Sequence, residues 1–157
     1  MTSGQPLSTA REIMLGFAEE TGLTGEKTPR RYLWTDAFAV CTFLELHRQS
    51  GDAIWLEFAL RLVDQVHAVL GRHRPDDWRS GWISGLEEGE GALHPTAGGL
   101  RIGKGMNERE PAEPFDERRE WDRDGQYYHY LTKWMHALAR VGRVTGEERY
   151  TRWAVEL

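Results

Sequence analysis

The segment L-W-T-D-A-F-A-V-C-T-F-L-E-L-H-R-Q-S-G-D, residues 33–52, decides the fold. Its apolar residues leave almost no polar face, which is typical of a helix buried on all sides. Such a helix is expected to start near Thr35 or Asp36, since both residues are acceptable N-caps. After the short turn at residues 49–52, an amphipathic pattern runs from Ala53 to Leu70. The sequence therefore predicts a buried helix, a short turn and a helix with one face in solvent.

The same unit occurs a second time between residues 126 and 157. The turn at residues 50–52 aligns with residues 145–147 at an offset of 95, and the same offset aligns Tyr32 with Tyr127. A further amphipathic helix is expected from Leu7 to Glu20. We therefore predict an all-α fold of helical hairpins, in which buried inner helices alternate with half-exposed outer helices.

The long segment of residues 71–125 interrupts this pattern within what we expect to be one domain of residues 1–157. It is rich in glycine and proline and has no sustained helical period, so we predict an ordered, mostly non-helical excursion. The strings W-I-S-G-L and G-L-R-I-G within it fit the short strands of a β-hairpin. Residues 98–105 match G-x-x-x-x-G-K, but Gly105 stands where a phosphate-binding loop needs Ser or Thr.

The short turns join inner to outer helices, so the long connections should all lie at the end where the inner helices begin. Together with residues 121–138 (W-D-R-D-G-Q-Y-Y-H-Y-L-T-K-W-M-H-A-L), the quoted segment resembles the hairpin unit of the six-hairpin glycosidase-like superfamily. That superfamily includes unsaturated glucuronyl hydrolases and the N-acylglucosamine 2-epimerase group. The resemblance implies part of an (α/α)6 toroid, with a cleft at the N-terminal ends of the inner helices.

About two and a half hairpin units are present where a toroid needs six. Inner-face residues such as Phe38 and Trp134 should therefore lack partners, which predicts self-association through exposed inner-helix faces.

The composition excludes several classes of protein. The chain has 20 Lys and Arg against 25 Asp and Glu, a net charge of -5, and its basic residues are scattered, so no nucleic-acid partner is expected. No secretory signal or membrane-length apolar stretch is evident, which predicts a cytoplasmic protein without a membrane partner. No His, Cys or carboxylate spacing indicates a metal site, and no cofactor is expected. The single Cys41 lies in an apolar helix pattern and reads as a core residue.

Acidic residues at the predicted inner-helix starts are the first catalytic candidates. Asp36 precedes one inner helix, and Asp122 and Asp124 precede the other. Glycoside hydrolysis needs two carboxyl groups about 5–9.5 Å apart, and neighbouring helix starts lie at roughly that spacing. The resemblance to glucuronyl hydrolases favours Asp36 with Asp124 as the acid/base pair. Each could equally be a helix cap, because aspartate is favoured at helix N-termini.

Histidines on the second inner helix offer a different chemistry. The superfamily's epimerases use inner-helix histidines to move a proton next to a carbonyl, which makes His129 a candidate and His136, two turns further along, a weaker one. Histidine suits this step because its pKa is near neutral. A hydrogen-bonded structural histidine is the alternative in each case.

Aromatic and basic residues complete the predicted substrate site. Sugar rings stack on flat aromatic faces, and five such residues cluster at the inner-helix starts: Tyr32, Trp34, Trp121, Tyr127 and Tyr128. From the long loop, Arg101 and Lys104 are expected to meet a carboxylate-bearing sugar. Two functions stay open: a carbohydrate-active enzyme fragment, hydrolase or epimerase, acting on a small saccharide, and a non-catalytic hairpin scaffold that binds a saccharide or a protein.

Overall fold

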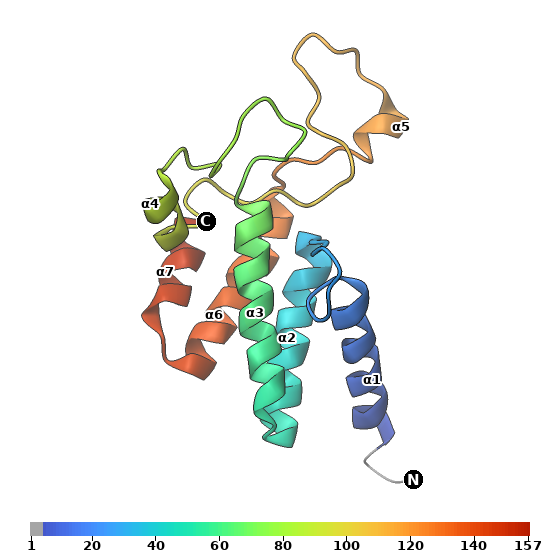
Figure 1. Ribbon diagram of the computed structural model, residues 1–157, viewed down its shortest axis with the longest axis vertical. Coiled ribbons are helices and arrows are strands. Elements are labelled where there is room, and N and C mark those ends of the chain that lie inside the picture. The colour runs from blue at the N-terminus through green and yellow to red at the C-terminus, as the bar shows by residue number, and fades with distance from the viewer. Residues whose placement is uncertain (1–4) are drawn as a thin grey trace.

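The computed structural model describes residues 5–157, and the regular secondary structure within that range is helical (Figure 1). Five helices form the body of the molecule: α1 (Gln5–Glu20), α2 (Leu33–Ser50), α3 (Ala53–Leu70), α6 (Tyr128–Thr145) and α7 (Glu148–Glu156). Two short helices, α4 (Glu88–Leu93) and α5 (Glu117–Glu120), lie within the long connection between α3 and α6. The prediction of an all-α fold is confirmed. None of the helices described is long and apolar enough to cross a membrane.

The 95-residue repeat is visible in the helix boundaries. Helices α2 and α6 each have 18 residues, and α6 begins and ends 95 residues after α2. Each helix follows an extended tyrosine, Tyr32 or Tyr127, and ends at a left-handed glycine, Gly51 with φ 70° or Gly146 with φ 72°. Glycine suits that position because it adopts positive φ without steric cost. The predicted start at Thr35 or Asp36 is wrong by one turn, because Tyr32 is the N-cap of α2.

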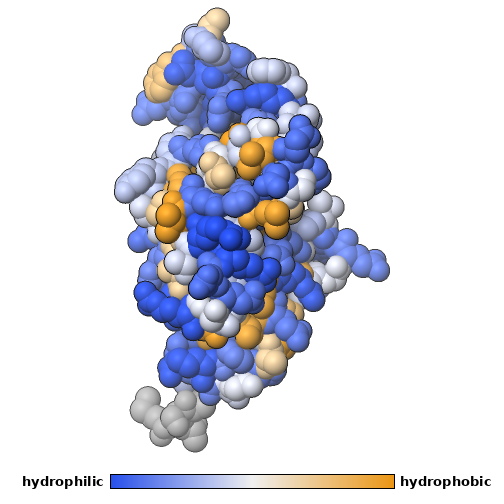
Figure 2. All heavy atoms as spheres, turned by 90° about the vertical axis from the view of Figure 1, so that its left-hand side faces the viewer, coloured by the Kyte–Doolittle hydropathy of each residue, from blue (hydrophilic) through white to orange (hydrophobic). Residues whose placement is uncertain are grey.

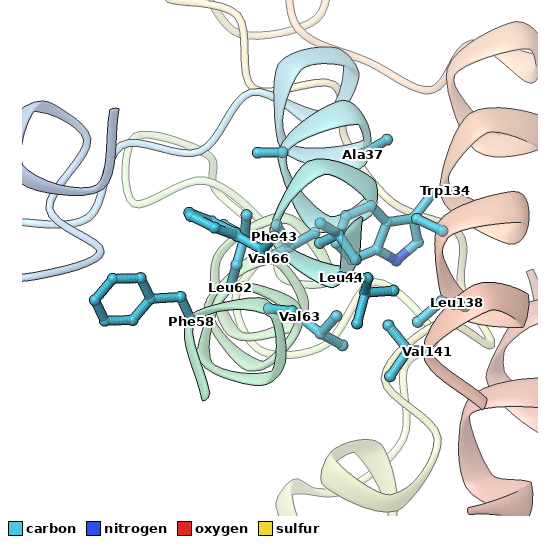
Figure 3. Packing of buried hydrophobic residues seen from close by; sticks show 14 of the residues in the cluster. Ala37, Phe43, Leu44, Phe58, Leu62, Val63, Val66, Trp134, Leu138 and Val141 are labelled. Atoms are coloured by element: carbon cyan, nitrogen blue, oxygen red, sulfur yellow. The ribbon is translucent and has the colours of Figure 1, made fainter. Parts of the chain in front are cut away.

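The core lies where α2, α3 and α6 meet. Helix α2 packs against α1, α3 and α6, while α3 also contacts α6, and α7 packs on α6. Figure 3 shows apolar side chains of the three helices interlocking between them. Fully or almost fully buried examples are Phe43 and Leu44 on α2, Leu62, Val63 and Val66 on α3, and Trp134, Leu138 and Val141 on α6.

A buried polar contact also joins α3 to α6. The Trp134 indole Nε1–H donates to His67 Nε2 at 3.0 Å, and both residues are buried. Since an indole N–H can only donate, Nε2 of His67 must be unprotonated. Burial lowers the pKa of His67 to about 3, which keeps the ring neutral. The expectation that Trp134 would lack a partner is therefore wrong, because α3 covers it.

The expectation that α2 and α6 are buried on all sides is wrong. Each carries a stripe that no helix covers, and the Phe38 side chain on α2 is 53% exposed, as predicted for an inner-face residue without a partner. On α6 the corresponding stripe includes the exposed Lys133 and His136. By contrast, the side of the molecule formed by α4 and α7 is mostly hydrophilic, with separate apolar patches (Figure 2).

The long connection gathers at one end of the helical body, where α2 and α6 begin and α3 ends (Figure 1). The predicted β-hairpin is absent from the residues that the structure describes. Residues 71–125 contain two isolated bridges instead, one joining Arg72 to Trp82 and one joining Met106 to Arg123. Part of the reason is that the backbone around Arg101 bonds to helix ends rather than to a neighbouring strand.

Residues 100–103 tie three helix ends together. The Arg101 N–H donates to the Leu70 carbonyl at the end of α3, and the Ile102 N–H donates to the Gly125 carbonyl before α6. In return the Ile102 carbonyl accepts the Leu33 N–H at the start of α2. Gly103 follows with φ 90°, where an added Cβ would overlap the Arg31 carbonyl oxygen.

Replacing Gly103 by alanine tests how tightly this segment is held. We expect Gly103→Ala to lower the free energy of unfolding by at least about 1–3 kcal/mol, since it adds backbone strain and a clash with backbone. Gly105→Ala is the matched control, because its Cβ would meet nothing within 4 Å. Urea denaturation of both variants gives the comparison, and equal stabilities would contradict the role assigned to Gly103.

Candidate functional site

A small aromatic pocket lies at the junction of α2, α6 and the long loop. It has a volume of about 230 Å³, and its aromatic walls are Tyr32, Trp121, Tyr127 and Tyr130. Sites for drug-sized ligands occupy about 300–1,000 Å³, so this pocket suits a ligand of roughly one ring. Trp121 is 78% exposed and Tyr127 is 40% exposed, so both present ring faces to solvent.

The loop residue Lys104 projects between two of these rings. Its Nζ lies 5.1 Å from the ring centroid of Trp121 and 5.7 Å from that of Tyr32. Each distance is within range of a cation–π contact. The ammonium group is thus held beside the most exposed aromatic face of the pocket.

A pair of tyrosine hydroxyls lies in the pocket wall. The Tyr32 and Tyr130 oxygens are 2.6 Å apart, and one hydroxyl donates to the other. Burial, together with this hydrogen bond, raises the pKa of Tyr32 to about 12. Tyr32 is therefore neutral near pH 7 and offers a hydroxyl rather than a phenolate to a ligand.

His129 contributes an exposed imidazole ring to the pocket. Its ring centroid lies 4.8 Å from that of Tyr130, 6.0 Å from Tyr127 and 6.1 Å from Trp34. Two charged side chains, Glu120 and Arg123, complete the lining. An imidazole with an accessible edge can exchange a proton with a bound ligand.

Five of the residues predicted from sequence meet in this pocket, namely Tyr32, Lys104, Trp121, Tyr127 and His129. Trp34 does not line the pocket but packs against Tyr130, at 5.2 Å between ring centroids. Tyr128 is 78% exposed but does not line the pocket. Asp122 is also exposed and lies outside the lining.

Four lining residues were not predicted: Ile102, Glu120, Arg123 and Tyr130. Tyr130 has a sequence signal, because it lies three residues after Tyr127 and so on the same helical face. The two charged residues had none beyond their closeness to Trp121.

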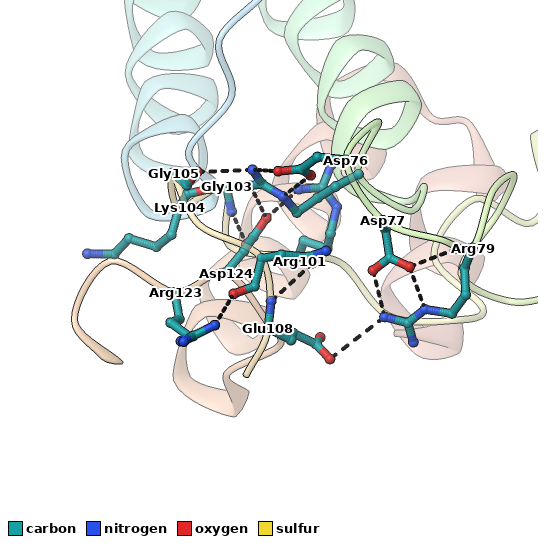
Figure 4. Close-up of polar contacts among 12 residues, drawn as sticks. Asp76, Asp77, Arg79, Arg101, Gly103, Lys104, Gly105, Glu108, Arg123 and Asp124 are labelled. Atoms are coloured by element: carbon teal, nitrogen blue, oxygen red, sulfur yellow. Dashed lines mark hydrogen bonds and ion pairs between the residues drawn. The ribbon is translucent and has the colours of Figure 1, made fainter. Parts of the chain in front are cut away.

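The carboxylate of Asp124 is buried and surrounded by hydrogen-bond donors (Figure 4), and it does not line the aromatic pocket. One oxygen accepts the Gly103 N–H at 2.8 Å and the Gly125 N–H at 3.0 Å. The other is paired with Arg101 and, at 3.3 Å, with Arg74. These contacts give Asp124 a structural task, which occupies the groups that proton transfer would need.

Arg101 is turned inward by the same cluster. Besides Asp124, its guanidinium donates to the Arg72 carbonyl at 2.7 Å and the Val69 carbonyl at 2.6 Å. Its predicted place beside a sugar carboxylate at the rim is therefore not where the structure puts it. Buried carbonyl groups near a helix end need hydrogen-bond donors, and the sequence does not reveal which arginine will supply them.

Asp36 is buried in the first turn of α2. Its carboxylate accepts the Tyr32 N–H at 2.9 Å and lies 3.6 Å from Nη1 of Arg31. Burial raises the pKa of Asp36 to about 7, although Arg31 and the backbone hydrogen bond act in the opposite direction. Asp36 faces a separate hollow with Arg30 and Thr35, not the aromatic pocket.

The proposed acid/base pair of Asp36 and Asp124 is thus divided between two arginine clusters. Neither carboxylate lines the aromatic pocket. Within residues 5–157, no group of three or more His, Cys, Asp or Glu side chains is arranged to hold a metal ion. Comparisons with protein-family models, curated proteins and solved structures found no match for this chain.

Removing the charge of Asp124 tests its structural task. We expect Asp124→Asn to lower the free energy of unfolding by about 3–5 kcal/mol, because Arg101 and Arg74 lose their buried counter-charge. Asp122→Asn is the matched control, and as an exposed substitution it should change stability by no more than about 0.5 kcal/mol. Chemical denaturation measures both, and a stable Asp124→Asn protein would contradict the structural assignment.

Asp36 and His67 should contribute to the pH dependence of stability with opposite signs. Asp36 has a pKa of about 7 against an ordinary 3.8, so the folded chain holds a proton that the unfolded chain releases, and stability falls as pH rises through this range. His67 has a pKa of about 3 against 6.5, so only the unfolded chain takes up a proton, and stability falls as pH drops from 6.5.

Between pH 3.8 and 6.5 the two contributions should partly cancel in the unmodified protein. We expect Asp36→Asn to lose stability more steeply on acidification, and His67→Leu less steeply, each by up to about 1.4 kcal/mol per pH unit. Urea midpoints at several pH values measure the slopes. Parallel slopes for the three proteins would show that neither group titrates as stated.

Proposed function

We propose that this chain binds a saccharide, with one sugar ring stacked on Trp121 in the aromatic pocket. The observation that carries the proposal is the exposed indole face of Trp121 with the Lys104 ammonium held beside it. Aromatic faces supply the apolar contact for a sugar ring, while Tyr127 and the Tyr32 hydroxyl supply polar partners. Lys104 would favour a ring that carries a carboxylate.

The wider setting of the proposal is a carbohydrate-active protein of the (α/α) toroid type. The hairpin repeat supports this setting, because the inner helices α2 and α6 begin, end and are capped at equivalent positions. A pocket at their N-terminal ends supports it as well. A protein of this type would hydrolyse or epimerise a sugar. His129 is the side chain best placed to transfer a proton in either reaction, because it is exposed in the pocket, whereas Asp36 and Asp124 are paired with arginines.

Binding without chemistry is the second candidate function, and the same arginine contacts favour it. A hydrolase requires two carboxyl groups across the scissile bond. Glu120 is the carboxylate that lines the pocket, and it is itself paired with Arg109 at 2.9 Å.

Replacing Trp121 tests the saccharide site directly. We expect Trp121→Ala to weaken binding of galacturonic acid about two- to twelvefold, since aromatic stacking contributes roughly 0.5–1.5 kcal/mol. Trp78→Ala is the matched control, because Trp78 is 85% exposed and lies outside the pocket. Isothermal titration calorimetry measures both variants, with N-acetylglucosamine and cellobiose as neutral ligands.

The same samples separate the enzyme from the binding module. Conversion of any of these sugars that is lost in His129→Gln, while sugar binding remains, would support hydrolysis or epimerisation at this site. Binding without turnover in the unmodified protein would support the module alone. If none of these sugars binds, or if both tryptophan variants bind like the unmodified protein, the pocket is not a saccharide site.

A further inference from the structure

A second hollow lies on the uncovered face of α2 and α6. Its volume is about 210 Å³, and its lining residues are Ala37, Phe38, Cys41, Lys133, His136 and Arg140. These two helices pack against each other. The hollow is therefore a groove between parallel helices of the same register.

The 95-residue register explains how the groove is lined. Positions 34, 38, 41 and 45 on α2 are spaced by four, three and four residues, so they share one helix face. Their counterparts on α6 are positions 129, 133, 136 and 140, which share the equivalent face. The register therefore aligns Trp34 with His129, Phe38 with Lys133, Cys41 with His136 and Glu45 with Arg140. In the structure, Trp34 contacts both His129 and Lys133, and Arg140 lies beside Cys41.

This arrangement places ring faces along one side and basic groups along the other. Nζ of Lys133 lies 5.7 Å from the ring centroid of Trp34, which in turn lies 5.7 Å from the ring of Phe38. Ring contacts lead from the aromatic pocket to the groove: His129 lines the pocket and contacts Trp34, whose ring in turn contacts Phe38 in the groove.

The charges on the groove select for an anionic occupant. Lys133, His136 and Arg140 follow one another along α6, over two turns or about 10 Å. Glu45 is the acidic counterpart on α2; its carboxylate is bound by Arg48 and Gln49 of its own helix, and the nearby Arg140 charge also helps to lower its pKa, so Glu45 offsets part of the Arg140 charge. Asp36 is buried at 1% exposure and is paired with Arg31, so it does not offset the positive charge.

We propose that the groove binds the continuation of an acidic oligosaccharide whose first ring occupies the Trp121 pocket. The inference rests on the proposed function and adds to it a ligand of several units with negative charge. Carboxylate-bearing units meet Lys133 and Arg140, and sugar faces meet Trp34 and Phe38. A second copy of the chain fits the face less well, because it would bring another set of the same basic side chains.

The test compares ligands of different length and charge on the same protein. Calorimetry at low salt is carried out with galacturonic acid, tetragalacturonic acid and the methyl ester of the tetramer. We expect the acidic tetramer to bind at least tenfold more tightly than the monomer and the ester, and the gain to shrink as salt is added.

Substitutions in the groove test whether it is the source of the tighter binding of the tetramer. Lys133→Ala combined with Arg140→Ala should remove the advantage of the tetramer and leave monomer binding unchanged. Lys27→Ala is the matched control, since Lys27 is exposed elsewhere. Because Arg140 is half-buried, the exposed single variant Lys133→Glu is measured as well, and it should show the same loss of advantage.

Each outcome separates the groove from the pocket. Monomer and tetramer binding equally would overturn the groove proposal while leaving the saccharide pocket intact. Tetramer binding that depends on Lys133, without monomer binding, would support the groove and reject the pocket as an independent site. A dimer in sedimentation equilibrium that Lys133→Glu dissociates would identify the occupant as a second copy and overturn the proposal.

Discussion

The end of the molecule that carries the aromatic pocket depends on the contacts of the buried Asp124 carboxylate. This carboxylate accepts hydrogen bonds from the Gly103 and Gly125 N–H groups and forms an ion pair with Arg101, whose guanidinium also donates to a carbonyl at the end of α3. One side chain therefore fixes the long loop relative to the end of α3 and the start of α6. The aromatic pocket takes its walls from α2, the loop and α6, so its shape depends on this fixation.

Such a cluster is built from groups that resemble a catalytic site in sequence. Moving a carboxylate and two guanidinium groups out of water costs several kcal/mol per ion, and the interior tolerates them because every lone pair meets a donor. The same saturation removes the freedom that a general acid or base requires. An aspartate near the start of an inner helix can thus be a structural residue or a general acid or base, and only its hydrogen-bond and ion-pair partners distinguish the two roles.

Features that repeat locally were predictable from the sequence, whereas long-range partners were not. The hairpins, their short turns and the 95-residue register follow from helical periodicity and glycine caps, which are properties of neighbouring residues. The direction of Arg101, the contact of Trp134 with His67 and the absence of a β-hairpin depend on segments roughly 30–70 residues away. Most of the aromatic pocket was predictable because its rings adjoin the inner-helix starts, while Glu120 and Arg123 join it through the path of the loop.

The two inner helices also show which residues are needed for the fold and which are specific to one copy. Both helices begin after a tyrosine with nearly the same backbone angles, yet the position of Asp36 in α2 is occupied by Leu131 in α6. A leucine cannot accept the N–H of the capping tyrosine, so this helix start does not require an aspartate. The loop carbonyl of Ile102 already accepts the Leu33 N–H of α2. Asp36 is therefore better explained by its pairing with the buried Arg31, which donates to the Thr21 carbonyl and so secures the segment after α1.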